Sequence, residues 1–259
     1  MVHTADTRIE APNWHPDGTR LLVNGGGRLF WLHLDAPERL HPLDTGDCTS
    51  CNNDHGISPD GRTVALSHHL EGGSCIFTVP AAGGSPRRVT GRLPSYWHGW
   101  SPDGGTLVYT AKRGDTFDIF TIPLEGGEET RVTATDGHCD GPDYTSDGQW
   151  IWFNGDHAGD GADLFRVRPD GTGLERMTED AFVNWFPHPS PDGSEVLYLA
   201  YPEGTTGHPE DLPVELRLMP AGGGAPRTVA AFRGGQGSIN VPCWAPDGSA
   251  FAYCRYPEG

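Results

Sequence analysis

The sequence predicts an all-β fold, a six-bladed β-propeller, and three observations lead to it. A four-residue phrase, Ser-Pro-Asp-Gly or a close variant, occurs six times, with its aspartates at Asp17, Asp60, Asp103, Asp147, Asp192 and Asp247. Successive aspartates are 43, 43, 44, 45 and 55 residues apart, a period typical of repeat architectures. Short β-branched and aromatic runs lie between the phrases, without a sustained helical period. Four short antiparallel strands in each repeat would make one propeller blade.

Each phrase is expected to be the tight turn between the first and second strands of a blade. Proline presets φ at the second turn position, Asp is tolerated at the third and Gly closes the fourth. The third repeat shows the full pattern, with strands expected at 97–101, 106–111, 117–124 and 130–134. Because one four-stranded blade cannot bury both of its faces, the blades should pack side by side around an axis.

We expect a single propeller domain over residues 1–259. The expected blades are 9–46, 47–91, 92–136, 137–180, 181–235 and, closing the ring, 236–259 together with 1–8. The last blade contains only two strand-like runs, at 239–245 and 250–255, to which residues 2–8 can add an outer strand. The sixth blade should therefore have three strands, contributed by both termini.

The charge balance of this acidic chain restricts its partners. Its 18 basic and 35 acidic residues give a net charge of −17, which disfavours nucleic acid and anionic membranes because both require a basic face. No run of 18 apolar residues and no secretory leader is visible, so the expected location is the cytoplasm, or the periplasm if a leader was removed. Of the six cysteines only Cys48 and Cys51 have ligand-like spacing, so free and mostly buried thiols are expected.

The repeat resembles the WD40-like repeat of the TolB family. The shared pattern is an aromatic residue before Ser-Pro-Asp-Gly, two strands, a Gly-Gly turn and an Arg-containing tail ending in Thr, as at 87–90, 131–133 and 176–178. In TolB the propeller is a periplasmic protein-binding platform that accompanies an N-terminal α/β domain, and the resemblance implies a binding role for a stand-alone form here. The same repeats occur in prolyl-oligopeptidase-like peptidases, but this sequence has no G-x-S-x-G motif.

The segments that enter the innermost strands differ between blades and should gather at one face. The Ser-Pro-Asp-Gly turns and the Gly-rich turns share the opposite, generic face. Three residues before the phrase, four repeats have Pro, whereas blades two and three have His55 and His98. The candidate ligand-binding residues at this central mouth are Asn53, Asp54, His55, Tyr96, Trp97, His98, Asp140, Asn184, Trp185, Gln236 and Asn240.

Four further loops are expected to reach the same face. Blade two contributes His68 and His69, and blade four contributes Asp156 and His157. Lys112 and Arg113 follow the second strand of blade three. Blade five carries ten extra residues, and its loop at 201–213 contains His208. An insertion on one face of a repeat protein is often part of its binding surface.

This mixture of side chains suits two kinds of ligand. Aromatic faces stack on sugar rings while amides, carboxylates and imidazoles bind hydroxyl groups, so a small polar ligand such as a saccharide is one candidate. A divalent metal (Mn, Zn or Ca) is the other, with His55, His98, His188 and Gln236 as its ligands. That set resembles the His-rich manganese site, which includes a Gln, of the oligogalacturonate lyases, propellers built from related repeats.

Structural and functional interpretations both remain open at this stage. His55 and His98 could equally be structural hydrogen-bonding groups of a channel, and His188 could enter a blade interface.

One function is a binding module for a polypeptide or a small polar ligand. The alternative is a metal-assisted lyase or hydrolase that acts on a saccharide, with His55 or His98 as metal ligand or general base. A purely structural disc is disfavoured because it predicts a broad apolar patch. The sequence does not decide whether the protein is an enzyme.

Overall fold

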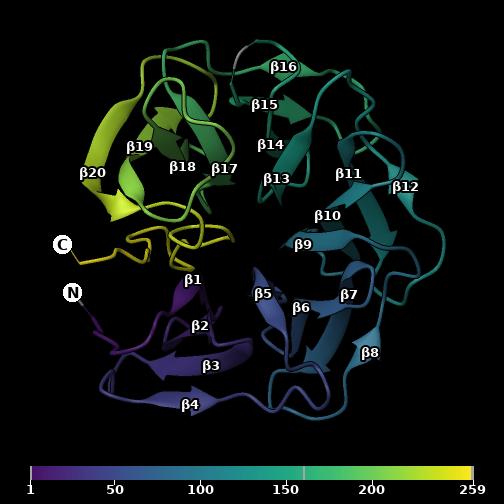
Figure 1. Ribbon diagram of the computed structural model, residues 1–259, viewed down its shortest axis with the longest axis vertical. Coiled ribbons are helices and arrows are strands. Elements are labelled where there is room, and N and C mark those ends of the chain that lie inside the picture. The colour runs from purple at the N-terminus through teal and green to yellow at the C-terminus, as the bar shows by residue number, and fades with distance from the viewer. Residues whose placement is uncertain (1, 160, 258–259) are drawn as a thin grey trace.

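Five four-stranded sheets surround a central axis in the computed structural model, which describes residues 2–159 and 161–257 (Figure 1). The first blade consists of β1 (Glu10–Trp14), β2 (Arg20–Gly25), β3 (Arg28–His33) and β4 (Leu40–Pro42). The second consists of β5 (Cys51–Ile57), β6 (Thr63–Leu70), β7 (Gly73–Pro80) and β8 (Arg87–Arg88). The third consists of β9 (Ser95–Trp100), β10 (Thr106–Lys112), β11 (Phe117–Pro123) and β12 (Thr130–Arg131). The fourth consists of β13 (Cys139–Tyr144), β14 (Ile151–Gly155), β15 (Asp163–Val167) and β16 (Glu175–Arg176). The fifth consists of β17 (Val183–Pro189), β18 (Glu195–Tyr201), β19 (Leu212–Pro220) and β20 (Arg227–Gly234).

In every blade the strands follow chain order from the axis to the rim (Figure 1). Neighbouring strands are antiparallel, as in β5–β6 and β6–β7. The prediction of an all-β propeller is confirmed. Within the two described ranges, no helix is long and apolar enough to cross a membrane.

The prediction of six blades is wrong, because the sixth repeat does not form a sheet. In the described part of the chain no strand follows β20, and Trp244 and Phe251 form only an isolated antiparallel bridge. The expected outer strand at 2–8 is also absent from the described residues. Two short runs without further partners cannot build a stable sheet. The prediction for residues 1 and 258–259 lies outside the described residues.

An irregular segment, 235–257, occupies the gap between β20 and β1 (Figure 1). Backbone hydrogen bonds fix it on both sides, since the Ala11 N–H donates to the Gly237 carbonyl and the Tyr256 N–H to that of Arg233. Trp244 donates its indole N–H to the His188 carbonyl at 2.9 Å. The ring is therefore closed by hydrogen bonds and packing instead of by a sixth blade.

The Ser-Pro-Asp-Gly phrases are turns, as predicted. At the second one the hydroxyl of Ser58 donates to Asp60 at 2.6 Å, and the N–H of Thr63 donates to the same hydroxyl at 3.0 Å. Gly61 has φ of +72°, a conformation that side chains with a Cβ rarely adopt. The hydrogen bond from Ser58 holds the pKa of Asp60 below its ordinary value. This aspartate thus shapes a turn.

The blades pack against each other through large buried side chains. Trp97 on β9 is fully buried, and its ring contacts Gly56 on the neighbouring strand β5 so closely that a Cβ there would lie 2.2 Å from Trp97 Cη2. Trp100 meets the same ring edge-on at 6.3 Å between centroids. Glycine at position 56 therefore makes room for an indole at the interface between blades two and three.

The cysteines are free thiols, as the sequence predicts, and five of the six are buried. Burial raises the pKa of Cys48 to about 11 and that of Cys51 to about 12. Such thiols are protonated at neutral pH and are poor metal ligands.

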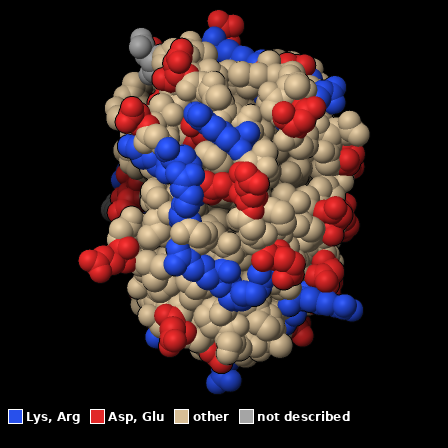
Figure 2. Space-filling view, turned by 90° about the vertical axis from the view of Figure 1, so that its right-hand side faces the viewer, with Lys and Arg blue, Asp and Glu red and all other residues tan. Residues whose placement is uncertain are grey.

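Basic side chains are found on the outer rim. Figure 2 shows the side of the molecule on the right of Figure 1, where Lys and Arg lie interspersed with Asp and Glu. Arg131 on β12 pairs with Asp118 at 2.6 Å, and Arg227 on β20 pairs with Glu195 at 2.9 Å. The positive charges of this acidic protein are thus partly committed to local ion pairs far from the axis.

Candidate functional site

All five innermost strands have a register irregularity just before the Ser-Pro-Asp-Gly turn. On β13 it falls between Asp140 and Asp143, and on β17 between Trp185 and His188. On β9 it leaves His98 without a partner, since Trp97 pairs with Tyr109 and Gly99 with Val108. A β-bulge re-aims the side chains around it. Here it exposes blade-specific residues to the axis.

Two of these bulges hold a non-glycine residue with positive φ, Ala11 at 52° and Phe186 at 55°. For a bulky residue this conformation is strained, at about 1–3 kcal/mol. The N–H of Phe186 donates to Asn154 Oδ1 at 3.1 Å, which holds the backbone in place. The ring of Phe186 then lies nearly parallel to that of His98, with centroids 6.3 Å apart. The strained bulge thus positions an aromatic wall beside the axial histidine.

A cavity of about 640 Å³ opens at the axis on this face. Blades two to five and the closing segment all contribute to its wall, and so does the blade-five insertion at 204–208. Its acidic and aromatic lining comprises Asp54, Asp140, Asp156, Tyr96, Phe117, Trp185 and Phe186. A second cavity of about 340 Å³ is lined in part by the same residues, Asn52, Asp54 and Gln236, and adds Asn53, Glu10 and Glu210.

His98 lies at the wall of the larger cavity between two acceptors. Its Nδ1 is 3.3 Å from the Asn240 carbonyl oxygen, and its Nε2 is 3.2 Å from Asp140 Oδ1. Because neither acceptor can donate, this arrangement favours a proton on both ring nitrogens. Burial would lower the pKa of His98, but the hydrogen bond that it donates to Asp140 and the charge of Asp54 raise it overall. In turn, His98 outweighs burial and lowers the pKa of Asp140.

Asp54 is the second carboxylate beside this histidine. It is buried and accepts hydrogen bonds from the amides of Asn52 at 2.6 Å and Asn240 at 3.2 Å. Burial raises its pKa, and the charge of His98 only partly offsets this. His98, Asp140, Asp54 and Asn240 form one polar cluster that spans blades two, three and four and the closing segment.

Eight of the eleven predicted ligand-binding residues lie on the two cavities, although ligand binding by them stays a prediction. Those on the larger cavity are Asp54, Tyr96, His98, Asp140, Trp185, Gln236 and Asn240, and Asn53 lies on the smaller one. Trp97 is an interface core residue instead. Asn184 is fully buried, and its amide donates to Asp180 at 3.1 Å within blade five.

His55 lies away from both cavities, fully buried within blade two. It pairs opposite Leu66 on β6, and its Nδ1 lies 3.4 Å from the Asn52 carbonyl oxygen. Burial lowers its pKa to about 4, so the ring is neutral. His55 is therefore enclosed by protein and does not face the mouth.

The four predicted metal ligands do not fit one metal ion. His188 is held by Asp143, with 3.0 Å from Nδ1 to Oδ2, and by the Ile239 carbonyl, with 2.6 Å from Nε2. Both ring nitrogens of His98 are likewise engaged. Among residues 2–159 and 161–257, no group of three His, Cys, Asp or Glu side chains is arranged to hold a metal.

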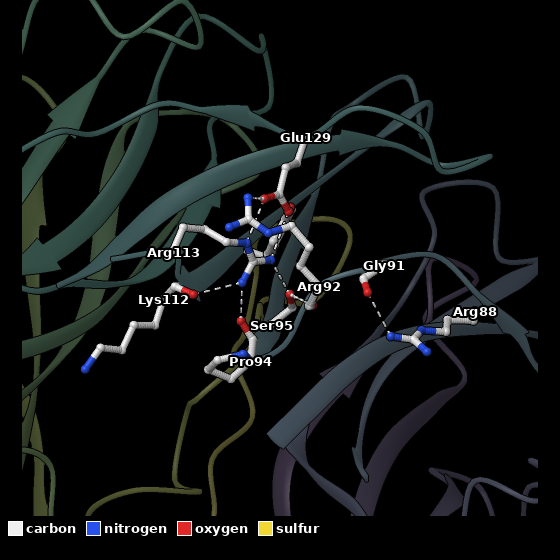
Figure 3. A network of polar contacts seen from close by, with 9 residues as sticks. Arg88, Gly91, Arg92, Pro94, Ser95, Lys112, Arg113 and Glu129 are labelled. Atoms are coloured by element: carbon white, nitrogen blue, oxygen red, sulfur yellow. Dashed lines mark hydrogen bonds and ion pairs between the residues drawn. The ribbon is translucent and has the colours of Figure 1, made fainter. Parts of the chain in front are cut away.

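The loop residue Arg113 is also placed differently from the prediction. It lines neither cavity and forms the network in Figure 3, in which its Nε lies 2.7 Å from Glu129 Oε1 and its Nη2 lies 2.7 Å from Ser95 Oγ. Tyr109 donates its hydroxyl to the same Glu129 at 2.8 Å. This network holds blade three together.

Several cavity residues were not predicted from the sequence, among them Thr110, Phe117 and Asn154, whereas Asp156, which also lines the cavity, belongs to the blade-four loop expected at this face. Thr110 and Asn154 lie on second strands, where both are buried among apolar neighbours. A polar residue inside an apolar strand run is a signal that could have found them.

Known proteins are similar to this chain in sequence and in structure. The model of the TolB β-propeller domain matches residues 95–212. An uncharacterized protein of Agrobacterium fabrum is 49% identical over 249 residues, which cover 96% of this chain and 85% of that protein. The chain belongs to the TolB-like β-propeller family. A protein of Agrobacterium tumefaciens provisionally named TolB has a structure that matches this TolB-like propeller with a TM-score of 0.96 and 47% identity, over 98% of this chain and 92% of the other.

More distant structures share only the fold with this TolB-like propeller. TolB from Acinetobacter baumannii matches with a TM-score of 0.70 and 17% identity, over 85% of this chain and 53% of the other. An oligogalacturonate lyase in complex with manganese matches with a TM-score of 0.59 and 18% identity, over 88% and 67% of the two chains. The likeness to this lyase does not transfer its metal or its substrate.

Proposed function

We propose that this TolB-like propeller is a binding module that takes up a small polar ligand in the axial cavity. The cavity of about 640 Å³ carries the proposal. Its size falls within the roughly 300–1,000 Å³ of small-molecule sites. Carboxylates, amides and aromatic rings all line it, which is the lining expected for a polar molecule with an apolar face. A polypeptide would bind there through an inserted terminus or side chain.

The alternative, a metal-assisted lyase or hydrolase acting on a saccharide, has less support. A general base needs a ring nitrogen free to accept a proton. His98 donates from both nitrogens, and His55 is enclosed away from the cavity. The predicted metal ligands do not assemble, and the likeness to oligogalacturonate lyase extends to the fold alone.

A thermal-shift screen over sugars, amino acids and short peptides tests the proposal. A ligand that binds only the folded protein stabilises it by about 2.7 kcal/mol at a hundred times its Kd. Trp185→Ala removes a cavity wall, and Trp150→Ala is the matched control, because Trp150 packs under Arg166 and Arg168 outside both cavities. We expect a ligand that raises the melting temperature of the wild type and of the control but not that of Trp185→Ala. A shift of equal size in all three proteins would contradict the proposal.

A further inference from the structure

The larger cavity carries more negative than positive charge. Three carboxylates line it, those of Asp54, Asp140 and Asp156, whereas none of its described lining residues is Lys or Arg. A protonated His98 balances one of them. Asp54 is buried and Asp140 is half-buried, and uncompensated charge is unfavourable there, whereas Asp156 is exposed. A bound cation would relieve this imbalance.

Many cationic side chains are engaged in ion pairs away from the cavity lining. On the rim they pair with neighbouring acids, as Arg131 does with Asp118. Arg8 is bound by Glu10 and Glu210 of the smaller cavity, each at 2.7 Å. Lys112 lies with its Nζ 5.8 Å from the centroid of the Phe117 ring but is not one of the lining residues. A cationic ligand would therefore supply positive charge that the lining lacks.

Two carboxylates retain capacity to bind such a ligand. Asp140 uses Oδ1 to accept from His98 and from the Gly141 N–H at 2.8 Å, while its Oδ2 lies 3.8 Å from His208 Nε2, too far for a strong hydrogen bond. Asp156 uses Oδ1 to accept from the His138 N–H at 2.6 Å. The remaining oxygens are suited to charge-assisted hydrogen bonds, which are about twice as strong as neutral ones.

The cavity also contains a buried polar group without a satisfactory partner. Thr110 is 2% exposed and lines the cavity. Its hydroxyl lies near Asp140 without completing a hydrogen bond of acceptable geometry. Buried hydroxyls normally have a partner, so this one is available to a ligand that enters the cavity beside Asp140.

Aromatic rings provide the second half of a cation site. Tyr96 and Phe117 lie with centroids 6.3 Å apart, and Trp185 meets His208 at 4.4 Å. The faces of Trp, Tyr and Phe attract cations within about 6 Å, with a strength of about 0.5–2 kcal/mol. These rings line the same cavity as the free carboxylate oxygens.

We infer that the ligand of the axial cavity carries an ammonium group, bound by Asp140 and Asp156 beside the Thr110 hydroxyl and an aromatic ring. The inference rests on the proposed function, since it names the ligand class of the same site. An anionic ligand such as an oligogalacturonate would add negative charge to a cavity that already has an excess of it.

Calorimetric titration with two matched sets of probes tests this inference. The first set is D-glucosamine, D-glucose and D-glucuronate, and the second is 2-phenylethylamine, 2-phenylethanol and phenylacetate. We expect the amine of at least one set to bind about tenfold more tightly than its neutral and anionic partners. Added salt should weaken that binding.

Two variants locate the charge contact. Asp156→Asn, in an exposed loop, and Asp140→Asn should each weaken amine binding about tenfold, whereas Asp147→Asn, a turn aspartate outside the cavity, should leave it unchanged. If a neutral or anionic probe binds as tightly as the amine, the charge inference is wrong while the binding function stands. If no probe of either set binds, the charge inference is also wrong, and the wider thermal-shift screen decides the binding function. If both cavity variants bind the amine as tightly as the wild type, the charge inference is wrong as well.

Discussion

The imidazole of His98 on β9 donates to Asp140 on β13, with 3.2 Å between Nε2 and Oδ1. The same ring donates from Nδ1 to the carbonyl of Asn240 in the closing segment, at 3.3 Å. One side chain therefore joins blades three and four to the segment that stands in place of a sixth blade. The candidate site and the closure of the ring share their polar contacts.

Removing His98 should destabilise the protein strongly. His98→Ala leaves Asp140 without its charged partner and Asp54 without its compensating charge, and breaking a buried pair in this way costs about 3–5 kcal/mol. Urea unfolding of the variant measures this loss. His69→Ala, at an exposed histidine, is the control and should change the free energy of unfolding by less than about 0.5 kcal/mol. Equal small effects of both substitutions would show that the His98 contacts contribute little.

The same contact predicts how stability depends on pH. The pKa of His98 is raised above 6.5, so its contribution is complete below pH 6.5 and is lost as pH rises through the folded-state pKa. The pKa of Asp140 is lowered below 3.8, so its contribution is complete above pH 3.8 and is lost as pH falls through the folded-state pKa. The advantage of the wild type over His98→Asn in free energy of unfolding should therefore be largest between these two values. A pH-independent difference would contradict this assignment.

The backbone at Phe186 predicts an unusual order of stability. With φ of 55°, this residue occupies a conformation that glycine adopts without strain, so Phe186→Gly should be more stable than Phe186→Ala by about 1–2 kcal/mol. Phe153, within β14 and also buried, is the control. There the free energy of unfolding of the Ala variant should exceed that of the Gly variant by about 0.5–1 kcal/mol. Denaturant unfolding of the four variants decides this. The same order at both positions would show that Phe186 is not strained.

The interface of blades two and three should not tolerate a methyl group at Gly56. A Cβ there would lie 2.2 Å from Trp97, and such overpacking costs about 1–3 kcal/mol. Gly91→Ala is the control, because nothing lies within 4 Å of its added Cβ. Thermal unfolding of both variants should show a marked loss only for Gly56→Ala. A neutral Gly56→Ala would mean that Trp97 can move out of the interface.

The network in Figure 3 predicts different responses from two arginines that bind one carboxylate. Arg113 is buried and makes several hydrogen bonds with its planar group, whereas the Arg92 side chain is 63% exposed. Arg113→Lys leaves buried acceptors unsatisfied and should cost about 1–3 kcal/mol. Arg92→Lys should cost less than about 0.5 kcal/mol. Urea unfolding distinguishes the two variants. Equal losses in free energy of unfolding would contradict a structural role for the buried guanidinium group of Arg113.

Local sequence patterns were sufficient to predict five blades, but the sixth blade that they predicted does not form. A turn such as that at Ser58 and Asp60 depends on neighbouring residues, and the two strands beside it pair with each other. A blade also requires partners for its outer strands. The runs around Trp244 and Phe251 have strand-like composition but pair only in one bridge. The composition of a run indicates whether it can form a strand, but not whether a neighbouring strand is available to pair with it.

The two histidines that replace proline show why the site was only partly predictable. His55 and His98 lie equally far from their turns, yet their strands bulge at different residues. On β5 the irregularity falls at 52–54, so His55 pairs opposite Leu66 and is turned into the blade. On β9 the unpaired residue is His98 itself, which faces the axis. A shift of one residue reverses the side of a strand on which a side chain lies, and spacing alone does not reveal it.

Uptake of a ligand at the axis is tested most directly by a crystal structure of the protein with whichever of the six probes binds most tightly. We expect electron density for that probe between Trp185 and Asp140, in the cavity lined by the blade-five insertion. Density for the probe only on the rim or on the face of the Ser-Pro-Asp-Gly turns, with none in the axial cavity, would contradict a binding function at this site.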